Sequence, residues 1–183
     1  MVARKLLLAT VLVACVPWGR PSAATAAPQF APPEIIFSGK AAGPPSSSVC
    51  GFAVVARGDG PQLAVMKRPP SFVAAVRGNE HVSVSFPCQR AAGRLSVTVE
   101  VCLTFGGEAD AELSIGDRRV QERLRPGRSV KLKVDYEAGE ASLVIRATTR
   151  ARGQEAGVRW RGLRVETSGG RFDVPAWPTE ARP

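Results

Sequence analysis

The stretch "LSVTVEVCLTF", residues 95–105, alternates apolar and polar side chains along its whole length. A period of two places successive side chains on opposite faces of a β-strand that is buried on one face. A helix would spread the same apolar residues around its whole circumference, so the pattern excludes a helix. We therefore expect a strand whose odd-numbered residues, from Leu95 to Phe105, face a core. Its even-numbered residues, among them Glu100 and Cys102, face solvent.

The same alternation recurs on either side of this stretch. In "HVSVSFP" (residues 81–87) the two valines and Phe86 share one face, and His81, Ser83 and Ser85 share the solvent face. Three more segments repeat the pattern: "AELSI" (residues 111–115), "SVKLKVDY" (residues 129–136) and "SLVIRATT" (residues 142–149). Glycine-bearing turns separate them, such as "RPGRS" and "YEAGEA". The chain therefore consists of successive strands, and no stretch has the length and 3.6-residue spacing of a helix.

The segment "VRWRGLRVE", residues 158–166, changes its parity in the middle. Val158 and Trp160 occupy even positions, whereas Leu163 and Val165 occupy odd ones. A β-bulge at Gly162 would restore all four side chains to one inner face, because a bulge inserts one extra residue into a strand. The three arginines of the segment would then point to solvent. A short edge strand is expected to follow at "RFDV" (residues 171–174).

Eight to ten short strands with turns at close intervals predict a single all-β domain, an antiparallel β-sandwich. A closed barrel is the lesser alternative. Residues 82–166 resemble the galactose-binding-like jelly rolls of carbohydrate-binding modules, which often close on a W-x-x-L-x-V strand, here Trp160, Leu163 and Val165. The resemblance favours a jelly roll over an immunoglobulin-like sandwich.

The N-terminus has the order of a secretory signal: basic residues, an apolar run too short to span a bilayer, then small residues. Two processing sites stay open. "LVAC" (residues 12–15) resembles the lipobox of bacterial lipoproteins, which implies lipidation of Cys15, whereas "ATA" allows cleavage after Ala26. We expect a signal and the start of a linker at residues 1–26 and a linker at 27–33. The sandwich follows at residues 34–175 and a Pro-rich tail at 176–183, in an exported protein of the cell envelope, the periplasm or the exterior.

Three further cysteines lack the close spacing of a zinc or redox site. In an oxidising compartment one disulfide and one spare thiol is the simplest arrangement. Cys88 continues the apolar register of its strand, whereas Cys102 lies on a polar face. We therefore favour a Cys50–Cys88 disulfide, although the sequence does not fix the pair.

The chain is basic, with a net charge of +9, but the basic residues are spread singly and acidic residues are interleaved with them. This arrangement is typical of a solvated face and argues against nucleic acid as a partner. A membrane would be contacted only through a lipid on Cys15.

No catalytic constellation stands out. The chain has one histidine, His81, on a polar strand face, and no G-x-S-x-G motif. We expect no catalytic residue and no cofactor. A structural calcium held by Glu108 and Asp110 is an alternative, because hard cations take oxygen ligands. Trp177 is the candidate for stacking on a sugar, and a loop-end site built from Arg and Asp stays open.

The sequence thus predicts an exported, non-catalytic β-sandwich that binds a glycan or another cell-envelope component. The alternative is an envelope structural or assembly lipoprotein whose partner is a protein. An enzyme acting on wall polymers would require a pair of carboxylates in a cleft, and ranks behind both.

Overall fold

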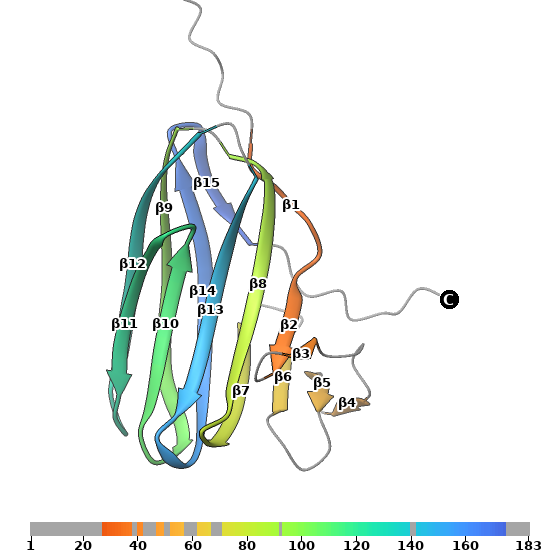
Figure 1. Cartoon of the computed structure of the whole chain (residues 1–183), viewed down its shortest axis with the longest axis vertical. Helices are drawn as coiled ribbons and strands as arrows, with labels where there is room; N and C mark the ends of the chain where they lie inside the picture. Colours follow the sequence, from red (N-terminus) through yellow and green to blue (C-terminus); the bar gives the residue numbers. More distant parts are fainter. Residues whose placement is uncertain are drawn as a thin grey trace, which may run out of the picture.

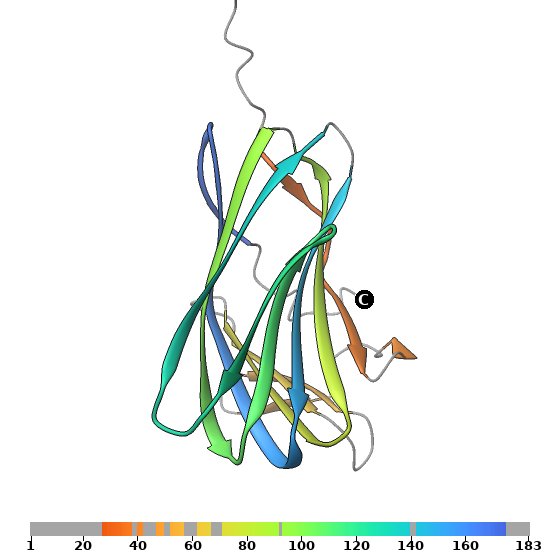
Figure 2. The ribbon, with the colours of Figure 1, turned by 60° about the vertical axis from the view of Figure 1, so that its left-hand side comes forward.

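The computed structural model describes residues 27–37, 40–41, 47–49, 52–56, 62–66, 71–91, 93–139 and 142–174. These residues form two antiparallel sheets that face each other as a sandwich (Figures 1 and 2). In the described ranges no helix has the length and apolar content needed to cross a membrane. The all-β sandwich expected from the sequence is therefore confirmed.

The first sheet, named here the β8 sheet, runs in spatial order through β11 (Arg118–Leu124), β10 (Ala109–Ile115), β13 (Leu143–Ala151), β8 (His81–Arg90), β2 (Glu34–Phe37) and β3 (Lys40–Ala41). The strand β1 (Gln29–Phe30) also pairs with β8. This pair lies inside the segment expected to be a linker, so the chain already contacts the sandwich before residue 34.

The second sheet, the β9 sheet, runs through β12 (Ser129–Ala138), β9 (Gly93–Gly106), β14 (Gly153–Thr167), β7 (Ser71–Gly78), β6 (Gln62–Met66), β5 (Phe52–Ala56) and β4 (Ser47–Val49). The strand β15 (Gly170–Asp173) pairs with β14. The last long strand of the chain, β14, thus lies between β9 and β7.

Strand order identifies the sandwich as a jelly roll. From β7 to β14 each strand lies in the sheet opposite to its predecessor, except that β10 and β11 form a hairpin within the β8 sheet. The two four-strand blocks are β11-β10-β13-β8 and β12-β9-β14-β7. This double-sheet pattern of eight strands is that of a jelly roll. The predicted preference over an immunoglobulin-like sandwich is confirmed.

The core lies between the sheets and is centred on Trp160. Its ring stacks on Phe72 of the neighbouring strand, with the ring centroids 5.7 Å apart. The indole Nε1 donates a hydrogen bond of 2.8 Å to Thr149 Oγ1 on β13, so this bond joins the two sheets. Both residues are buried, and a buried indole N–H requires such a partner.

The bulge expected at Gly162 is present. Arg161 pairs with Glu100 and Arg164 with Thr98, so three steps on β14 match two on β9. Gly162 has a φ of +66°, a left-handed conformation that suits glycine. As predicted, the four apolar residues of "VRWRGLRVE" are buried, and Arg161 and Arg164 are exposed.

Three expectations about strands need correction. Residues 118–124, for which no strand was predicted, form the edge strand β11. Ser83 and Ser85, expected to face solvent, are buried because Thr148 and Arg146 on β13 cover them, with hydrogen bonds of 2.9 and 3.3 Å. The described strands number fifteen rather than eight to ten, and several are long.

A fourth correction concerns Phe105, which was expected to face the core but has 47% of its surface exposed. Gly157 pairs with Phe105, and Val158 pairs with Leu103, so one extra residue, Thr104, is inserted into β9. This second bulge reverses the parity at the end of the strand. It turns the phenyl ring onto the outer face of the β9 sheet.

Candidate binding groove

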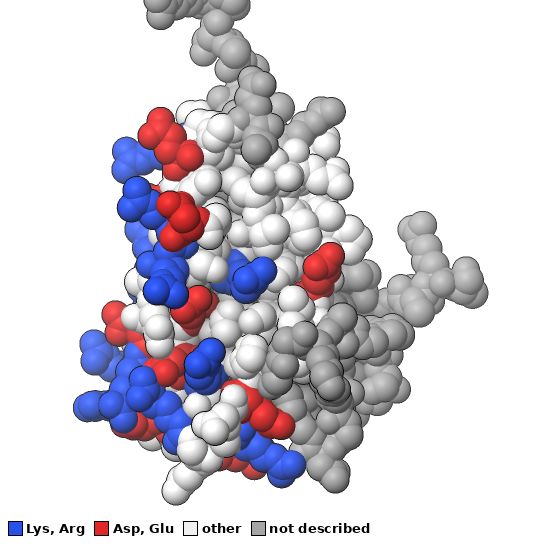
Figure 3. Space-filling model, in the orientation of Figure 1, with Lys and Arg blue, Asp and Glu red and all other residues white. Residues whose placement is uncertain are grey.

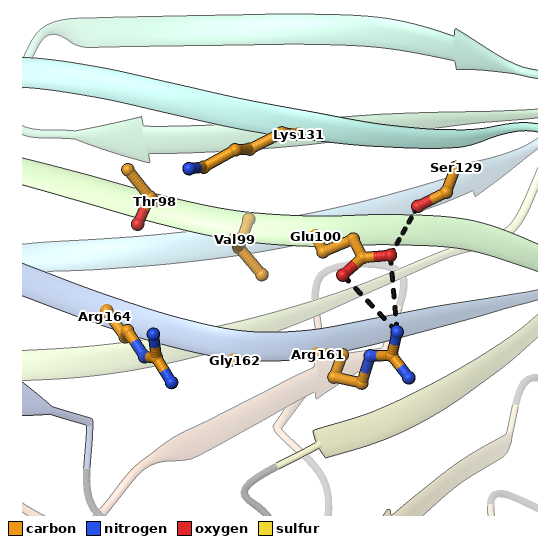
Figure 4. A pocket seen from close by; sticks show the side chains of 8 residues that line it. All are labelled: Thr98, Val99, Glu100, Ser129, Lys131, Arg161, Gly162 and Arg164. Carbon is orange, nitrogen blue, oxygen red and sulfur yellow. Dashed lines mark hydrogen bonds and ion pairs between the residues drawn. The ribbon is translucent and has the colours of Figure 1, made fainter.

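The outer face of the β9 sheet carries an open groove of about 550 Å³, which spans three strands. Its lining residues are Thr98, Val99 and Glu100 on β9, Ser129 and Lys131 on β12, and Arg161, Gly162 and Arg164 on β14 (Figure 4). Strand register explains why they meet: Lys131, Glu100 and Arg161 form one row across the sheet, and Thr98 and Arg164 belong to the next.

The bulge at Gly162 shapes this groove in two ways. Arg161 and Arg164 would face opposite sides of a regular strand, but the extra residue places both side chains on the outer face. Gly162 itself has no side chain, and a Cβ built on it would meet open space. The groove is therefore hollow where the two arginines flank the glycine.

Glu100 is held in place by two donors. Ser129 Oγ donates a hydrogen bond of 2.7 Å to Glu100 Oε1, and Arg161 Nη2 lies 3.4 Å from both carboxylate oxygens (Figure 4). The Ser129 hydrogen bond, followed by the charge of Arg161, lowers the pKa of Glu100 from its ordinary value. The carboxylate thus stays ionised and fixed at neutral pH, where it can accept hydrogen bonds from hydroxyl groups.

Beyond the groove, the outer face of the β9 sheet continues along β14 and β9 toward Gly157 and Phe105. Arg159 pairs with Cys102, and its Nε is buried without a hydrogen-bond partner among the described residues. Phe105 follows, lying over Gly157, where a Cβ would collide with its ring. Thr104 Oγ1 donates a 3.0 Å hydrogen bond to the carbonyl oxygen of Gly157 and fixes the bulge. A polar groove and an exposed aromatic ring therefore share one face, about 20 Å apart at the rise of an extended strand.

The outer face of the β8 sheet is different. In the view of Figure 3, basic and acidic side chains intermingle over its side nearer β11. Asp110, whose side chain is 11% exposed, accepts a hydrogen bond of 2.8 Å from Arg152 Nε. Glu108 forms ion pairs with Arg123 and, at 3.6 Å, with Arg125. This arrangement agrees with the solvated face predicted from the sequence.

The two carboxylates considered as calcium ligands, Glu108 and Asp110, thus contact arginines that already neutralise their charge. Within the described ranges no group of three or more His, Cys, Asp or Glu residues is placed to hold a metal ion. The calcium site stays a prediction that these contacts do not favour.

Other sequence candidates lie elsewhere. His81 begins β8 and is half-buried beside Arg150. Cys88 is buried, and Cys102 is half-buried on the outer face of β9. Cys15, Cys50 and Trp177 lie outside the described residues. Lipidation, the Cys50–Cys88 disulfide and sugar stacking on Trp177 therefore stay predictions.

The sequence did not identify Phe105, Lys131 or Arg164 as members of a site. It predicted that Lys131 and Arg164 face solvent, but not that β9 brings them together. The signal for Phe105 was Gly157, because a glycine inside a strand often marks a bulge or a close approach by another group.

No family model and no curated protein matches the sequence. Three solved structures illustrate what the fold is similar to. TmCBM61, solved in complex with β-1,4-galactotriose, shares 9% identity, with 68% of this chain and 89% of that chain covered and a TM-score of 0.46. The CBM22-1 xylan-binding domain of Paenibacillus barcinonensis Xyn10C shares 15% identity over 72% and 91% of the two chains, with a TM-score of 0.41.

A CBM4 structure shares 11% identity over 68% of this chain and 77% of that chain, with a TM-score of 0.36. All three are carbohydrate-binding modules, the class of domain that residues 82–166 were expected to resemble. At these values the ligands of those modules are not transferred to this chain.

Proposed function

We propose that this chain is a non-catalytic glycan-binding domain whose ligand lies on the outer face of the β9 sheet. The observation that carries the proposal is the groove over Thr98, Glu100 and Arg161. It combines a fixed carboxylate acceptor with guanidinium and hydroxyl donors. Sugars present many hydroxyl groups on a ring with apolar faces, so convergent polar groups and an aromatic platform on one protein face suit a chain of several sugars.

Phe105 supplies the platform at the other end of this face. Two large apolar side chains are exposed among the described residues, Phe105 and Val144. Single exposed apolar residues are common on protein surfaces. Phe105 differs because its ring is fixed over Gly157 on the face that holds the groove, whereas Val144 belongs to β13 of the other sheet.

Binding rather than hydrolysis is proposed because of the carboxylates. Glycosidases normally use two carboxyl groups on either side of the scissile bond. Among the residues that line the groove, Glu100 is the single carboxylate, and its lowered pKa is unsuited to a general acid at neutral pH.

Affinity gel electrophoresis of the full-length chain tests the proposal, with soluble galactan, xylan and polygalacturonate in the gels. We expect at least one polymer to retard the protein. Phe105→Ala and Arg161→Ala should abolish most of that retardation. Val144→Ala and Arg146→Ala are the matched controls, because they remove the same kinds of exposed side chain from the β8 sheet. Unretarded migration of natively folded protein in every gel would refute the proposal.

Export to the cell envelope is a separate part of the proposal, supported by the order of residues at the N-terminus. Palmitate labelling in a bacterial host distinguishes its two forms. Label that is lost in Cys15→Ala would support the lipid anchor. Unchanged processing in that variant would favour cleavage after Ala26.

A further inference from the structure

The charges in the groove are unequal. Its lining residues include three cations, Lys131, Arg161 and Arg164, and the single carboxylate of Glu100. Arg161 and the Ser129 hydroxyl already contact that carboxylate, at 3.4 and 2.7 Å. The negative charge of Glu100 is therefore compensated by Arg161 at the end of the groove near Ser129.

The opposite end of the groove is formed by two cations on either side of a hydroxyl group. Figure 4 shows Lys131 and Arg164 on opposite sides of Thr98, with the lysine side chain extending toward it. All three residues line the groove on the outer face, and their strands β12, β9 and β14 lie side by side in this order. A ligand group placed over Thr98 would lie between an ammonium and a guanidinium group.

Lys131 differs from its nearest counterpart, Lys133, which lies on the same face of β12 and next to it in the alternation. Lys133 Nζ lies 3.4 Å from the carboxylate of Asp135. For Lys131, which is exposed, no ion pair is found within the described part of the chain. Of these two lysines, Lys133 forms an ion pair, whereas Lys131, which lines the groove, forms none with the described residues.

We infer that this groove selects an acidic glycan, and that a sugar carboxylate binds over Thr98 between Lys131 and Arg164. The inference rests on the proposed function and names its ligand class. Lys131 and Arg164 bring two positive charges to this end of the groove, and the Thr98 hydroxyl can donate a hydrogen bond to the carboxylate. Hydroxyl groups of the neighbouring sugar would donate to Glu100.

Two polymers that differ only in charge provide the sharpest test. Biolayer interferometry would measure binding of the full-length chain to polygalacturonate and to the same polymer after complete methyl esterification, at about physiological ionic strength. We expect binding to the acidic form to be about tenfold tighter, which corresponds to one charge-assisted hydrogen-bonded contact. Dextran sulfate and duplex DNA serve as polyanions without carboxylates.

The variants Lys131→Gln and Lys133→Gln locate the contact, because they remove the same charge from neighbouring positions of one strand face. Lys131→Gln should weaken binding to polygalacturonate about tenfold and leave binding to the esterified polymer unchanged. Lys133→Gln should change either by less than about twofold. Far-UV circular dichroism would verify that both variants keep the β-sheet spectrum.

The remaining outcomes separate this inference from the proposed function. Equal or tighter binding to the esterified polymer or to neutral galactan would overturn the acidic ligand and leave glycan binding in place. Equal binding to polygalacturonate, dextran sulfate and DNA, with equal effects of the two lysine variants, would show unspecific attraction of polyanions and overturn the inference. Folded protein that binds none of the glycans would remove both.

Discussion

On the outer face of the β8 sheet, arginines lie beside carboxylates, as Arg152 does beside Asp110 and Arg123 beside Glu108. On the outer face of the β9 sheet, Arg161 and Arg164 border a hollow whose lining holds one acid. Both faces draw on the same arginine-rich composition. The difference lies in the backbone, because β14 has a bulge where a regular strand would have sent one of its two arginines inward.

The largest effect is expected from removing that bulge. Gly162→Pro keeps the length of β14 but fixes φ near −65°, which excludes the left-handed backbone of the bulge. In a strand of unchanged length without the bulge, Leu163 and Val165 would exchange their buried positions with charged neighbours. Each buried aliphatic side chain contributes on the order of 1.5–3 kcal/mol, and burying Arg164 adds a further cost. We expect Gly162→Pro to lose cooperative unfolding in urea. Gly162→Ala, which keeps the bulge, should lose only about 1–2 kcal/mol through its left-handed backbone.

The second bulge can be tested through Phe105. Gly157→Ala places a methyl group where the phenyl ring lies, and overpacking of this kind costs about 1–3 kcal/mol. Combining it with Phe105→Ala should remove most of that loss, because the colliding ring is gone. Urea unfolding of the two single variants and the double variant measures the coupling. Additive losses would mean that Phe105 does not lie on Gly157.

These two bulges also mark what a sequence can and cannot reveal. The bulge in β14 was predictable because the parity change falls at a glycine. The one in β9 was not, because Thr104 leaves the alternation of "LSVTVEVCLTF" unbroken and the extra residue appears only in the pairing with β14. Alternation in the sequence shows which side chains could face the core. The pairing with the neighbouring strand determines which of them are buried.

The edge strand β11 and the groove escaped prediction for related reasons. An edge strand can be charged on both faces, and β11 has only Val120 and Leu124 as its inward apolar residues. The groove joins residues near 98, 130 and 162. Each of these was correctly assigned to a solvent face, but the register that unites them is a property of three strands together.

A smaller difference in unfolding free energy is expected between variants of Asp110, which forms an ion pair on the β8 sheet, and of Glu100, which lines the groove. Asp110→Asn weakens a nearly buried acceptor of Arg152 and should cost about 1–2 kcal/mol of unfolding free energy. Glu100→Gln changes a side chain that is 45% exposed and screened by solvent, so it should lower stability much less than Asp110→Asn does. Denaturant unfolding at neutral pH measures both. Equal losses would contradict the division of the two faces into a structural and a binding surface.

The smallest expected effect is a change in one pKa. Ser129→Ala removes the main cause that lowers the pKa of Glu100, so this pKa should rise toward its ordinary value of 4.5 while Arg161 keeps it below. Because the folded pKa is depressed, the pairing stabilises the fold above the ordinary value, and this stabilisation is lost as the pH falls through the lowered one. Carboxyl carbon NMR titration follows the shift.

Asp135 provides the internal reference in the same titration. Its pKa is lowered chiefly by the hydroxyl group of Ser96, its cross-strand neighbour in a different row of the face. It should keep the same value in the Ser129→Ala variant. A pKa of Glu100 that does not move would mean that Ser129 does not hold this carboxylate in solution.

The central place of β14 has a consequence for how the polypeptide acquires its shape. Residues 153–161 pair with 71–78 on one side, and residues 156–167 pair with 95–106 on the other. Partners so distant along the chain make loop closure costly and folding slow. During synthesis the β9 sheet cannot close until residues 153–167 have left the ribosome, so β7 and β9 would present unpaired strand edges to chaperones until then.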